Sequence, residues 1–290
     1  MSAAQGSQAK FGIGTTSTVD QAYDFKSESI ACTEDFYDPD GIIGSREHLS
    51  ERVRTNIRHI GGPVTLEPNS IELANLLPWI LGANASGTTF ALSDTLPSRY
   101  VSIDRITKVF TYSGCVVNRA TFSASEGGPL VVNLDLVGVD ETVNNAGTFP
   151  SLTISTAAGP YMLSDLACTV GGTTYNFREF SITIDNMLET RFLNSLTATS
   201  ITPRDRMTSV MLRGPYADQS ALYGLSVAGV AVVATFTNST LSTVFTMPAV
   251  QFPRRSPTVP GKSEIYLPLQ GIARKSGSTA SLTVTNDSTP

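Results

Sequence analysis

The sequence contains few of the residues that enzymes use for acid–base, nucleophilic or metal chemistry. Among its 290 residues there are only two histidines and three cysteines. His48 and His59 form no HExxH motif, so they offer little for a metal centre or a general base. Cys32, Cys115 and Cys168 are widely spaced and form no CxxC pair, which indicates buried or free thiols instead of a disulfide framework or a zinc site. We therefore expect no enzymatic activity and no cofactor.

The chain is also low in charge and has no excess of basic residues. Charged residues make up 16% of the sequence, with 20 basic and 25 acidic side chains and a formal charge of -5. Surfaces that bind nucleic acid concentrate Lys and Arg, so this balance argues against a phosphate-binding protein. The first twelve residues lack the basic start and apolar stretch of a signal peptide. We therefore expect that the protein is first located inside the cell.

No apolar run is long enough for a membrane-spanning helix. The most apolar segment, residues 221–236, is rich in Val and is interrupted by Gly224, Ser226 and Gly229. It falls short of the roughly 18–20 residues that a span requires. We interpret it as a core strand preceded by a short helical turn.

Alternation of apolar and polar residues dominates the remaining sequence. It is clearest in LVVNLDL (130–136), FSITID (180–185) and RVRTNIRH (52–59). A period of two, with many Thr, Val and Ser residues between Gly and Pro, is typical of β-strands. We predict a mainly β fold, a β-sandwich or barrel, with one short helix packed on the sheet.

The predicted helix lies between Asn69 and Gly82. Asn69 is a good N-cap, and Glu72 three residues later completes a capping-box pattern. The leucines that follow have the spacing of one apolar helical face. Gly82 stands where a C-terminal glycine cap belongs, and Pro78 is expected to kink or shorten the helix.

An internal repeat organises the chain. VFT at 109–111 recurs at 244–246, and the glycines and apolar positions of 128–138 recur in 261–271. This period is too long for a solenoid and indicates a duplicated domain, although chance similarity between β-rich segments is the alternative. Gly12 and Gly14, with no strand pattern before them, suggest a flexible start. We divide the chain into an N-terminal arm (1–26), a first domain (27–145), a linker (146–160) and a second domain (161–290).

Two short motifs resemble functional sites but lack their context. The acidic residues of 36–47 fit several ligand positions of a calcium-binding EF-hand loop, but Phe36 replaces the first carboxylate and no helix pattern precedes it. The sequence GLSVA places Ser226 near a nucleophile-elbow pattern, yet the expected order of strand and helix is reversed and no base is positioned for it. An exposed acidic loop and an ordinary serine are the simpler interpretations.

Arginines cluster between the acidic loop and the predicted strand that follows. They have no interleaved aromatic residues and have acidic neighbours, so ion pairs at the surface or between subunits are a better interpretation than nucleic-acid contact. The single tryptophan is either an interface anchor or a core residue. The candidate inter-subunit residues are Arg46, Arg52, Arg54, Arg58 and Trp79.

Two long segments resemble a known family. Residues 41–82 (GIIGSREHLSERVRTNIRHIGGPVTLEPNSIELANLLPWILG) and 177–215 (FREFSITIDNMLETRFLNSLTATSITPRDRMTSVMLRGP) resemble the two halves of major tail-tube proteins of long-tailed bacteriophages, the siphophages. The resemblance extends over about residues 27–282, and its motifs are structural. The second copy departs from the pattern where Gly224 interrupts its helix.

The resemblance implies a structural virion protein, assembled in the host cytoplasm, whose copies form stacked rings around a lumen. DNA and the tape-measure protein would pass through this lumen without specific binding, and terminator and tail-tip proteins would close the tube. A duplicated chain would form rings of three copies, with six copies as the alternative. Another virion protein (a terminator, decoration or adhesin domain) and a β-rich hydrolase are the other readings.

The polar faces of the repeat strands are the expected lining of that lumen. Acidic groups there would repel DNA phosphates, because attraction to phosphate requires cations. The opposite sheet is the alternative lining. The candidate lumen-facing residues are Asn133, Asp135, Glu264, Tyr266 and Gln270.

Overall fold

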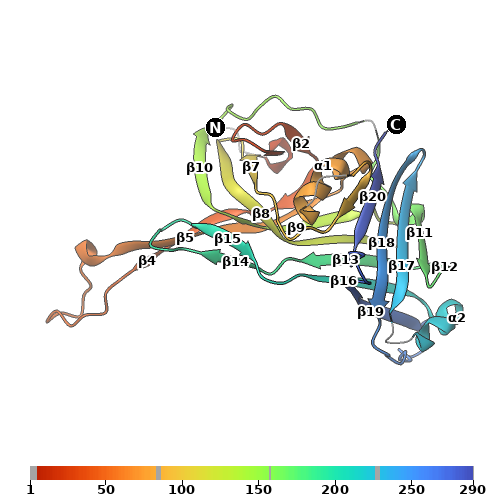
Figure 1. Ribbon diagram of the computed structural model, residues 1–290. Coiled ribbons are helices and arrows are strands. Elements are labelled where there is room, and N and C mark those ends of the chain that lie inside the picture. The colour runs from red at the N-terminus through yellow and green to blue at the C-terminus, as the bar shows by residue number, and fades with distance from the viewer. Residues whose placement is uncertain (1–4, 83–85, 157, 226–228, 290) are drawn as a thin grey trace.

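The structure, a computed structural model, describes residues 5–82, 86–156, 158–225 and 229–289. The chain is mainly β, as the alternation predicts, and it folds as two layers of strands with one long helix between them (Figure 1). A pair of strands drawn out into an arm projects from one side of this body.

One antiparallel sheet, which we call the long sheet, runs through both halves of the chain. In its middle the end of β8 pairs with β13, from Arg119 opposite Asp185 to Ser125 opposite Glu179. At one edge β3 (Phe25–Glu28) and β4 both pair with β5, one after the other along its length. In spatial order its strands are β4 (Ala31–Tyr37), β5 (Arg54–Leu66), β9 (Val131–Gly138), β8 (Lys108–Ser125), β13 (Glu179–Asp185), β16 (Met207–Pro215) and β19 (Tyr266–Arg274).

Two smaller antiparallel sheets, the cover sheets, form the second layer. The first consists of β2 (Gln21–Tyr23), β1 (Lys10–Gly14), β7 (Arg99–Asp104), the start of β8 and β10 (Asp140–Asn145). The second consists of β12 (Thr173–Tyr175), β11 (Leu166–Val170), β17 (Val230–Asn238), β18 (Leu241–Gln251), β20 (Thr283–Asp287) and β6 (Thr89–Ala91). Since β8 and the end of β18 also pair within the long sheet, both strands connect the two layers.

The two halves of the chain have the same pairing order. In the first half it is β2–β1–β7–β8–β10 with β4–β5–β9–β8. In the second half it is β12–β11–β17–β18–β20 with β13–β16–β19–β18. The strands that the sequence repeat relates, β8 with β18 and β9 with β19, hold corresponding places in these two series.

The remaining elements are short. A separate hairpin of β14 (Leu188–Arg191) and β15 (Ser200–Pro203) connects β13 to β16. The apolar segment that was predicted to form a short turn and then a core strand does so, with a 3-10 turn before β17. Helical turns occur at η1 (Gly6–Gln8), η2 (Ser50–Arg52), η3 (Leu163–Asp165), α2 (Tyr216–Gln219) and η4 (Ser220–Gly224).

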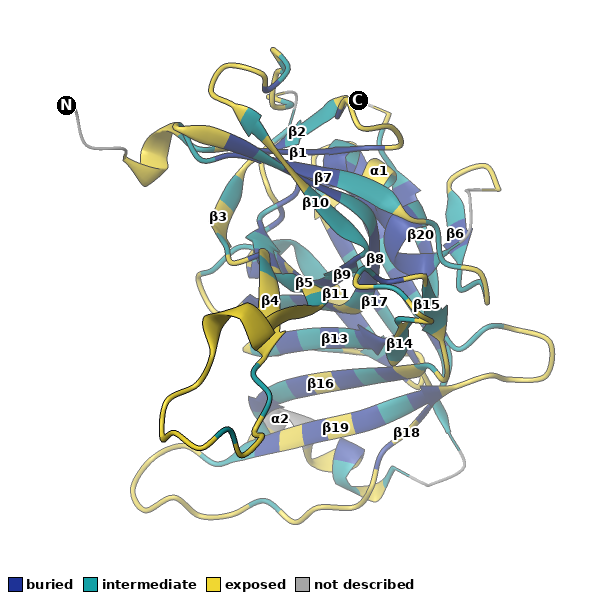
Figure 2. Cartoon of the chain, turned by 90° about the vertical axis from the view of Figure 1, so that its left-hand side faces the viewer, coloured by how far each residue is buried: buried dark blue, intermediate teal, exposed yellow. Residues whose placement is uncertain are grey.

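One continuous apolar core lies between the layers. Val132, Leu134 and Leu136 of β9 are fully buried, and the residues between them face the other way, as the alternation predicts. The same alternation of buried and exposed residues is visible along β13, β16 and β19 (Figure 2). Phe122 of the first half packs edge-on against Phe245 of the second, with ring centroids 5.1 Å apart. The two halves therefore share a core instead of burying separate ones.

Helix α1 (Ser70–Leu81) forms where the capping signals place it. The Asn69 side chain accepts a hydrogen bond from the Glu72 amide at 2.9 Å, and the Glu72 carboxylate accepts one from the Asn69 amide at 3.0 Å. Gly82 ends the helix with φ of 86°, a left-handed conformation that glycine adopts without steric cost. Pro78 lies in the last turn and does not end the helix early, because its own carbonyl still accepts a hydrogen bond from the Gly82 amide.

The capping box contains a buried carboxylate with a raised pKa. Burial raises the pKa of Glu72 above 4.5, the Asn69 amide opposes this shift and Asp24 adds to it. The second carboxylate oxygen, Oε1, has no hydrogen-bond partner among the described residues. Because the folded protein holds this proton more tightly, its stability falls as pH rises from about 4.5 through the raised pKa.

Glu72→Gln is therefore expected to raise the free energy of unfolding at pH 7, because glutamine keeps the capping geometry without burying a charge. The gain should disappear as the pH is lowered below about 4.5. Thermal unfolding midpoints measured between pH 4 and 7 would test this, with Glu47→Gln in an exposed loop as the control. A variant less stable than the native protein at pH 7 would show that the carboxylate itself stabilises the helix.

The start of the chain differs from the predicted arm. Residues 10–14 form β1 and residues 21–23 form β2, and Phe11 and Ile13 are buried in the core. Gly12 is needed for close packing here: a Cβ at this position would lie 2.8 Å from Cγ2 of Val19. A single-sequence pattern missed these strands because they are short and their glycines resemble a flexible segment. The segment assigned to a linker, residues 146–160, contains no strand or helix in its described part.

Candidate functional site

The outer face of the long sheet, which we call the polar face, carries side chains that are not covered by the cover sheets. Across β5, β9, β8, β13 and β16 one row of this face consists entirely of hydroxyl and amide side chains. The Asn133 amide donates to the Thr65 hydroxyl at 3.2 Å, and the hydroxyls of Thr121 and Thr183 lie 3.2 Å apart. This row offers hydrogen bonds but no net charge. Its members are Thr65, Asn133, Thr121, Thr183 and Ser209.

Ion pairs flank the row on both sides. Arg119 donates to the Asp185 carboxylate at 2.7 Å and lies opposite Asp135 in the sheet register. On the other side Arg213 donates to Glu179 at 2.7 Å. Each of these arginines is thus compensated by a carboxylate on the same face. A phosphate approaching the polar face would meet paired cations, which attract it less than free ones.

A third group of charges lies where the polar face reaches its edge. The guanidinium of Arg178 pairs with Glu126 and bonds the Tyr266 hydroxyl, and it lies 3.8 Å from Glu264. The Arg213 guanidinium also stacks on the Tyr266 ring, 4.7 Å from its centroid. Tyr266 is therefore held between two cations.

The residues predicted to face a lumen occupy one side of the sheet. Asn133 and Asp135 on β9 share the polar face with Tyr266 and Gln270 on β19, and Glu264 lies in the segment just before β19. The prediction omitted the ion-paired residues on β8, β13 and β16. Alternation in FSITID could have added Asp185, but the arginine partners come from strands that only the fold brings beside it. The omitted residues are Arg119, Asp185, Glu179 and Arg213.

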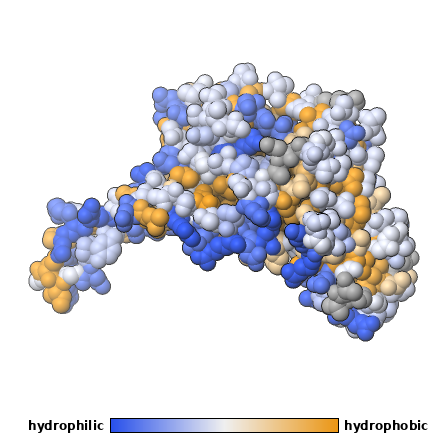
Figure 3. Space-filling view, viewed as in Figure 1, coloured by the Kyte–Doolittle hydropathy of each residue, from blue (hydrophilic) through white to orange (hydrophobic). Residues whose placement is uncertain are grey.

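The second feature is the arm, formed by the far end of β4, residues 38–53 and the start of β5 (Figure 1). Most of its residues are exposed, and Arg46, Arg52 and Arg54 lie along it. Apolar and charged side chains lie next to one another at its far end (Figure 3). The family resemblance of residues 41–82 includes an Arg-bearing extended arm, and the projecting segment agrees with it.

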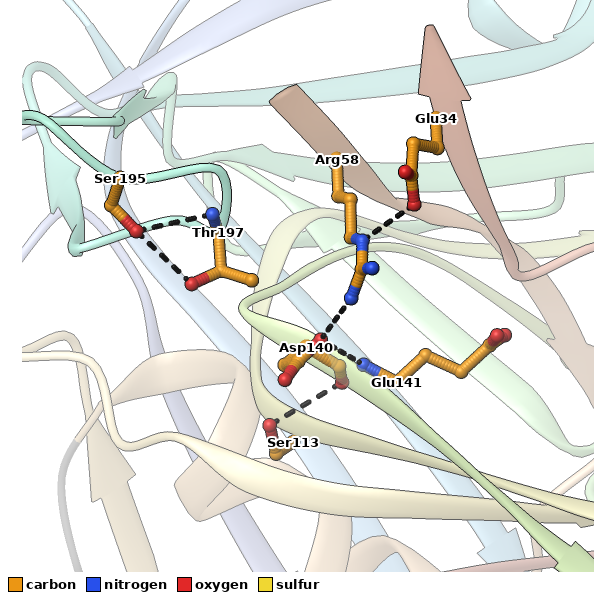
Figure 4. Close-up of polar contacts among 7 residues, drawn as sticks. All are labelled: Glu34, Arg58, Ser113, Asp140, Glu141, Ser195 and Thr197. Carbon is orange, nitrogen blue, oxygen red and sulfur yellow. Dashed lines mark hydrogen bonds and ion pairs between the residues drawn. The ribbon is translucent and has the colours of Figure 1, made fainter. Parts of the chain in front are cut away.

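Arg58 holds the base of the arm to the body. It donates to Glu34 on β4 at 2.6 Å and lies 3.8 Å from Asp140 on β10, so it bridges the two layers (Figure 4). The Arg58 amide donates to the Leu196 carbonyl of the β14–β15 hairpin at 2.8 Å. Of the four arginines predicted for inter-subunit contact, this one is engaged within the chain.

Trp79 is a core residue. Its side chain is fully buried, and its indole Nε1 donates to the Cys115 carbonyl of β8 at 3.0 Å. In this position it cannot reach a neighbouring subunit. Of the two interpretations of Trp79, core residue and interface anchor, the structure supports the core residue. The apolar helix face dictates this outcome, because Trp79 lies among buried leucines on α1.

The described residues offer no metal site, and two of the three thiols are buried. No group of three or more His, Cys, Asp or Glu side chains in the described part could hold a metal ion. In the acidic loop Asp38 instead pairs with His48 at 2.9 Å. Burial raises the pKa of Cys115 and Cys168 to about 12, so both thiols stay protonated and unreactive. Ser226 lies outside the described residues.

No helix within the described ranges is long and apolar enough to span a membrane.

Comparison with known proteins agrees with the resemblance seen in the sequence. No curated protein sequence matches the chain. The model of one family, described as phage tail tube protein, matches residues 6–285, which is nearly the whole chain. The chain therefore belongs to the phage tail tube protein family, whose members are structural subunits of the viral tail.

Proposed function

We propose that copies of this chain close into rings and that the rings stack into a tube that conducts DNA during ejection. The observation that carries this proposal is the long sheet: it crosses both halves of the chain, buries one face and leaves the other face, which is rich in polar side chains, open to solvent. A sheet of this kind can line a lumen when its edges join those of neighbouring copies. The terminator and tail-tip proteins would close the two ends of the tube, and the tape-measure protein would occupy its lumen before DNA.

We further propose that the chain is an internal duplication and that three copies make one ring with six similar units. The identical pairing order in the two halves supports this, together with the sequence repeat between β8–β9 and β18–β19. A three-copy ring would carry a formal charge of three times -5, or -15. The departure of the second half at α2, which has only four residues, makes the six units similar but not equivalent.

Ring closure would repeat the junction that already joins the halves. Within the chain, β13 pairs with the end of β8, and β4 corresponds to β13 in the pairing order. β4 pairs only with β5 among the described strands, so one of its edges is free. The segment that corresponds to the end of β8 in the second half is 254–260, which follows β18 and is almost entirely exposed. We propose that this segment of one copy pairs with β4 of the next.

The polar face is suited to passage without binding. Its central row is neutral, and its arginines at 119 and 213 are paired with carboxylates, so these two cations would attract phosphates less than free ones. Two effects would therefore act together. The net negative charge of the ring would repel DNA, and the ion pairs of Arg119 and Arg213 would weaken the attraction of these arginines for phosphate.

A different virion protein with the same fold is the second candidate. Such a protein would share the β-rich halves but would not stack into long tubes. A hydrolase lacks support, since its candidate serine has no positioned histidine in the sequence.

Electron microscopy of the concentrated, purified protein separates these possibilities. We expect stacked rings or tubes with a continuous lumen. Light scattering of an isolated ring should give the mass of three chains of 30.8 kDa each. Protein that stays monomeric at every concentration would contradict the proposal.

A further inference from the structure

Each residue of the junction between the two halves has a counterpart at the proposed junction between copies. For β8 the counterpart strand is β18, because VFT at 109–111 recurs at 244–246. Both strands also show a register shift at the same place, directly after Tyr112 in β8 and directly after Met247 in β18. A residue of β8 therefore corresponds to the residue 135 positions later (244 − 109).

The other strand of the junction, β13, has its counterpart in β4 and the short strand β3 before it. The sequence YDFKSESI at 23–30 recurs as YNFREFSI at 175–182. Tyr, Phe, Ser and Ile are identical in the two copies, and a basic residue follows Phe in both. A residue of β4 therefore corresponds to the residue 152 positions later (175 − 23).

The pairing of the long sheet gives the same register independently. In the first half Val116 pairs with Val137, the next residue Gly138 pairs with Ile60, and Ile60 pairs with Cys32. In the second half Gln251 pairs with Ile272, the next residue Ala273 pairs with Thr208, and Thr208 pairs with Ile184. Cys32 thus corresponds to Ile184. The sequence match of 128–138 with 261–271 is two residues out of step with this pairing, since it relates Gly138 to Gly271 and not to Ala273.

This register brings a charged residue to the centre of the junction between copies. Within the chain Ala120 pairs with Ile184, and both side chains are fully buried. Their counterparts are Arg255 and Cys32, so a repeat of the junction places Arg255 of one copy opposite Cys32 of the next. Arg255 is exposed and has no ion pair or hydrogen bond within the described residues.

Prolines on both sides of Arg255 fit this register. In the junction within the chain the Asn186 amide donates to the Asn118 carbonyl at 2.8 Å. Residues that exchange hydrogen bonds recur at every second position of an antiparallel pair. In β8 these residues are Asn118, Ala120 and Phe122, and their counterparts are Pro253, Arg255 and Pro257. Because proline has no N–H, only Arg255 among these three can donate to the edge of β4.

The edge of β4 has the complementary pattern. Ile30, which would lie opposite Pro257, needs no donor, because its carbonyl already accepts from Arg105 at 2.6 Å and from the Tyr112 hydroxyl at 3.0 Å. The Ile30 amide donates to Glu28 at 3.1 Å. A shift of the segment by two residues would place a proline opposite Cys32, whose carbonyl would then lack a donor.

The surroundings of Cys32 carry more negative than positive charge. Arg58 lies between Glu34, at 2.6 Å, and Asp140, at 3.8 Å, and Glu141 follows Asp140 in β10 (Figure 4). Burial raises the pKa of the Cys32 thiol, Glu141 and the other two carboxylates add to this shift, and Arg58 opposes it. Three carboxylates therefore act here with one guanidinium. A second guanidinium entering this cluster would be attracted to it.

We propose that Arg255 and Cys32 form the central pair of the junction between copies and that the Arg255 guanidinium enters this carboxylate cluster of the next copy. The inference rests on the proposed ring and specifies the register in which it closes. An ionic contact then replaces the apolar pair of Ala120 and Ile184, so closure of the ring depends on salt concentration. The contact also selects the correct edge, since Arg255 placed opposite Ile184 would be buried without a carboxylate.

Disulfide formation tests the register directly. Directly opposed residues that exchange hydrogen bonds have Cα atoms about 5.5 Å apart, which suits a disulfide. Arg255→Cys should therefore form a disulfide with the native Cys32 of the next copy when assembled rings are treated with oxidised glutathione. The oxidised glutathione takes up the two electrons and two protons of the thiols and leaves as two molecules of reduced glutathione. Non-reducing electrophoresis should show covalent dimers and larger multimers.

The neighbouring positions provide matched controls. Arg254→Cys and Ser256→Cys should not be linked, since their side chains would point to the opposite face of the strand. Arg255→Cys in a Cys32→Ser background should also stay unlinked, because Cys115 and Cys168 are buried. Rings that form by microscopy without this disulfide would overturn the inference and leave the proposed function intact. Equal linkage from position 254 or 256 would also overturn it.

The salt dependence of assembly gives a second readout that needs no cysteine variant. Between about 50 mM and about 500 mM NaCl, the native concentration for half-assembly should rise by about tenfold, because screening weakens the ionic contact. Arg255→Gln should start about tenfold higher at low salt and change by about threefold or less. Lys10→Gln, an exposed change on β1, should keep the native salt dependence. An Arg255→Gln chain with the native salt dependence would contradict the proposed contact.

Discussion

Replacing Asp135 and Asp185 together by asparagine is expected to make the assembled tube retain DNA. Asp185 and Asp135 are the carboxylates beside Arg119, so their removal leaves this guanidinium unpaired on the polar face. Asparagine can still accept the Met187 amide hydrogen bond that Asp185 accepts at 3.1 Å, so the local backbone should be kept. With three chains per ring the formal charge would change from -15 to -9.

The effect should be visible in two measurements. Phage particles built with the variant subunit should release DNA more slowly than native particles. Purified tubes should bind a short DNA duplex in low salt, and each phosphate contact should add up to about 0.9 to the slope of log affinity against log salt concentration. Asp20→Asn, an exposed change on the first cover sheet, is the control for charge alone. Unchanged release kinetics and no added DNA binding would show that this face does not line the lumen.

Replacing Trp79 by alanine is expected to lower the free energy of unfolding of the unassembled chain by about 3–5 kcal/mol. The side chain is fully buried between α1 and β8, and its loss leaves both a cavity and an unpaired Cys115 carbonyl. Trp79→Phe should have a smaller effect, because it keeps much of the apolar volume and loses only the indole donor.

Denaturant unfolding of the monomeric protein measures this difference. Tyr37→Ala, on the exposed arm, is the matched control and should change stability by no more than about 0.5 kcal/mol. A Trp79→Ala chain that unfolds at the native denaturant concentration would contradict the core role of this side chain.

Features fixed by local rules could be predicted from the sequence. The helix begins at its Asn69 cap and ends at Gly82, because capping and the left-handed glycine depend on a few neighbouring residues. β9 and β13 follow from alternation, since one face of each is buried. The family resemblance was confirmed, because the model of the phage tail tube protein family matches residues 6–285.

Features fixed by distant contacts could not be predicted. The pairing of β8 with β13 joins Arg119 to Asp185, 66 residues apart, and nothing near either residue signals it. The short strands β1 and β2 are stabilised by pairing, β1 with β7 and β2 with β1, and not by their own composition.

A cryo-electron microscopy reconstruction of the assembled protein tests the central claim most directly. We predict threefold rings in which each chain supplies two similar units, with Asn133 and Gln270 facing a continuous lumen. Rings of six chains, or a lumen lined by the cover sheets instead of the polar face, would contradict this account.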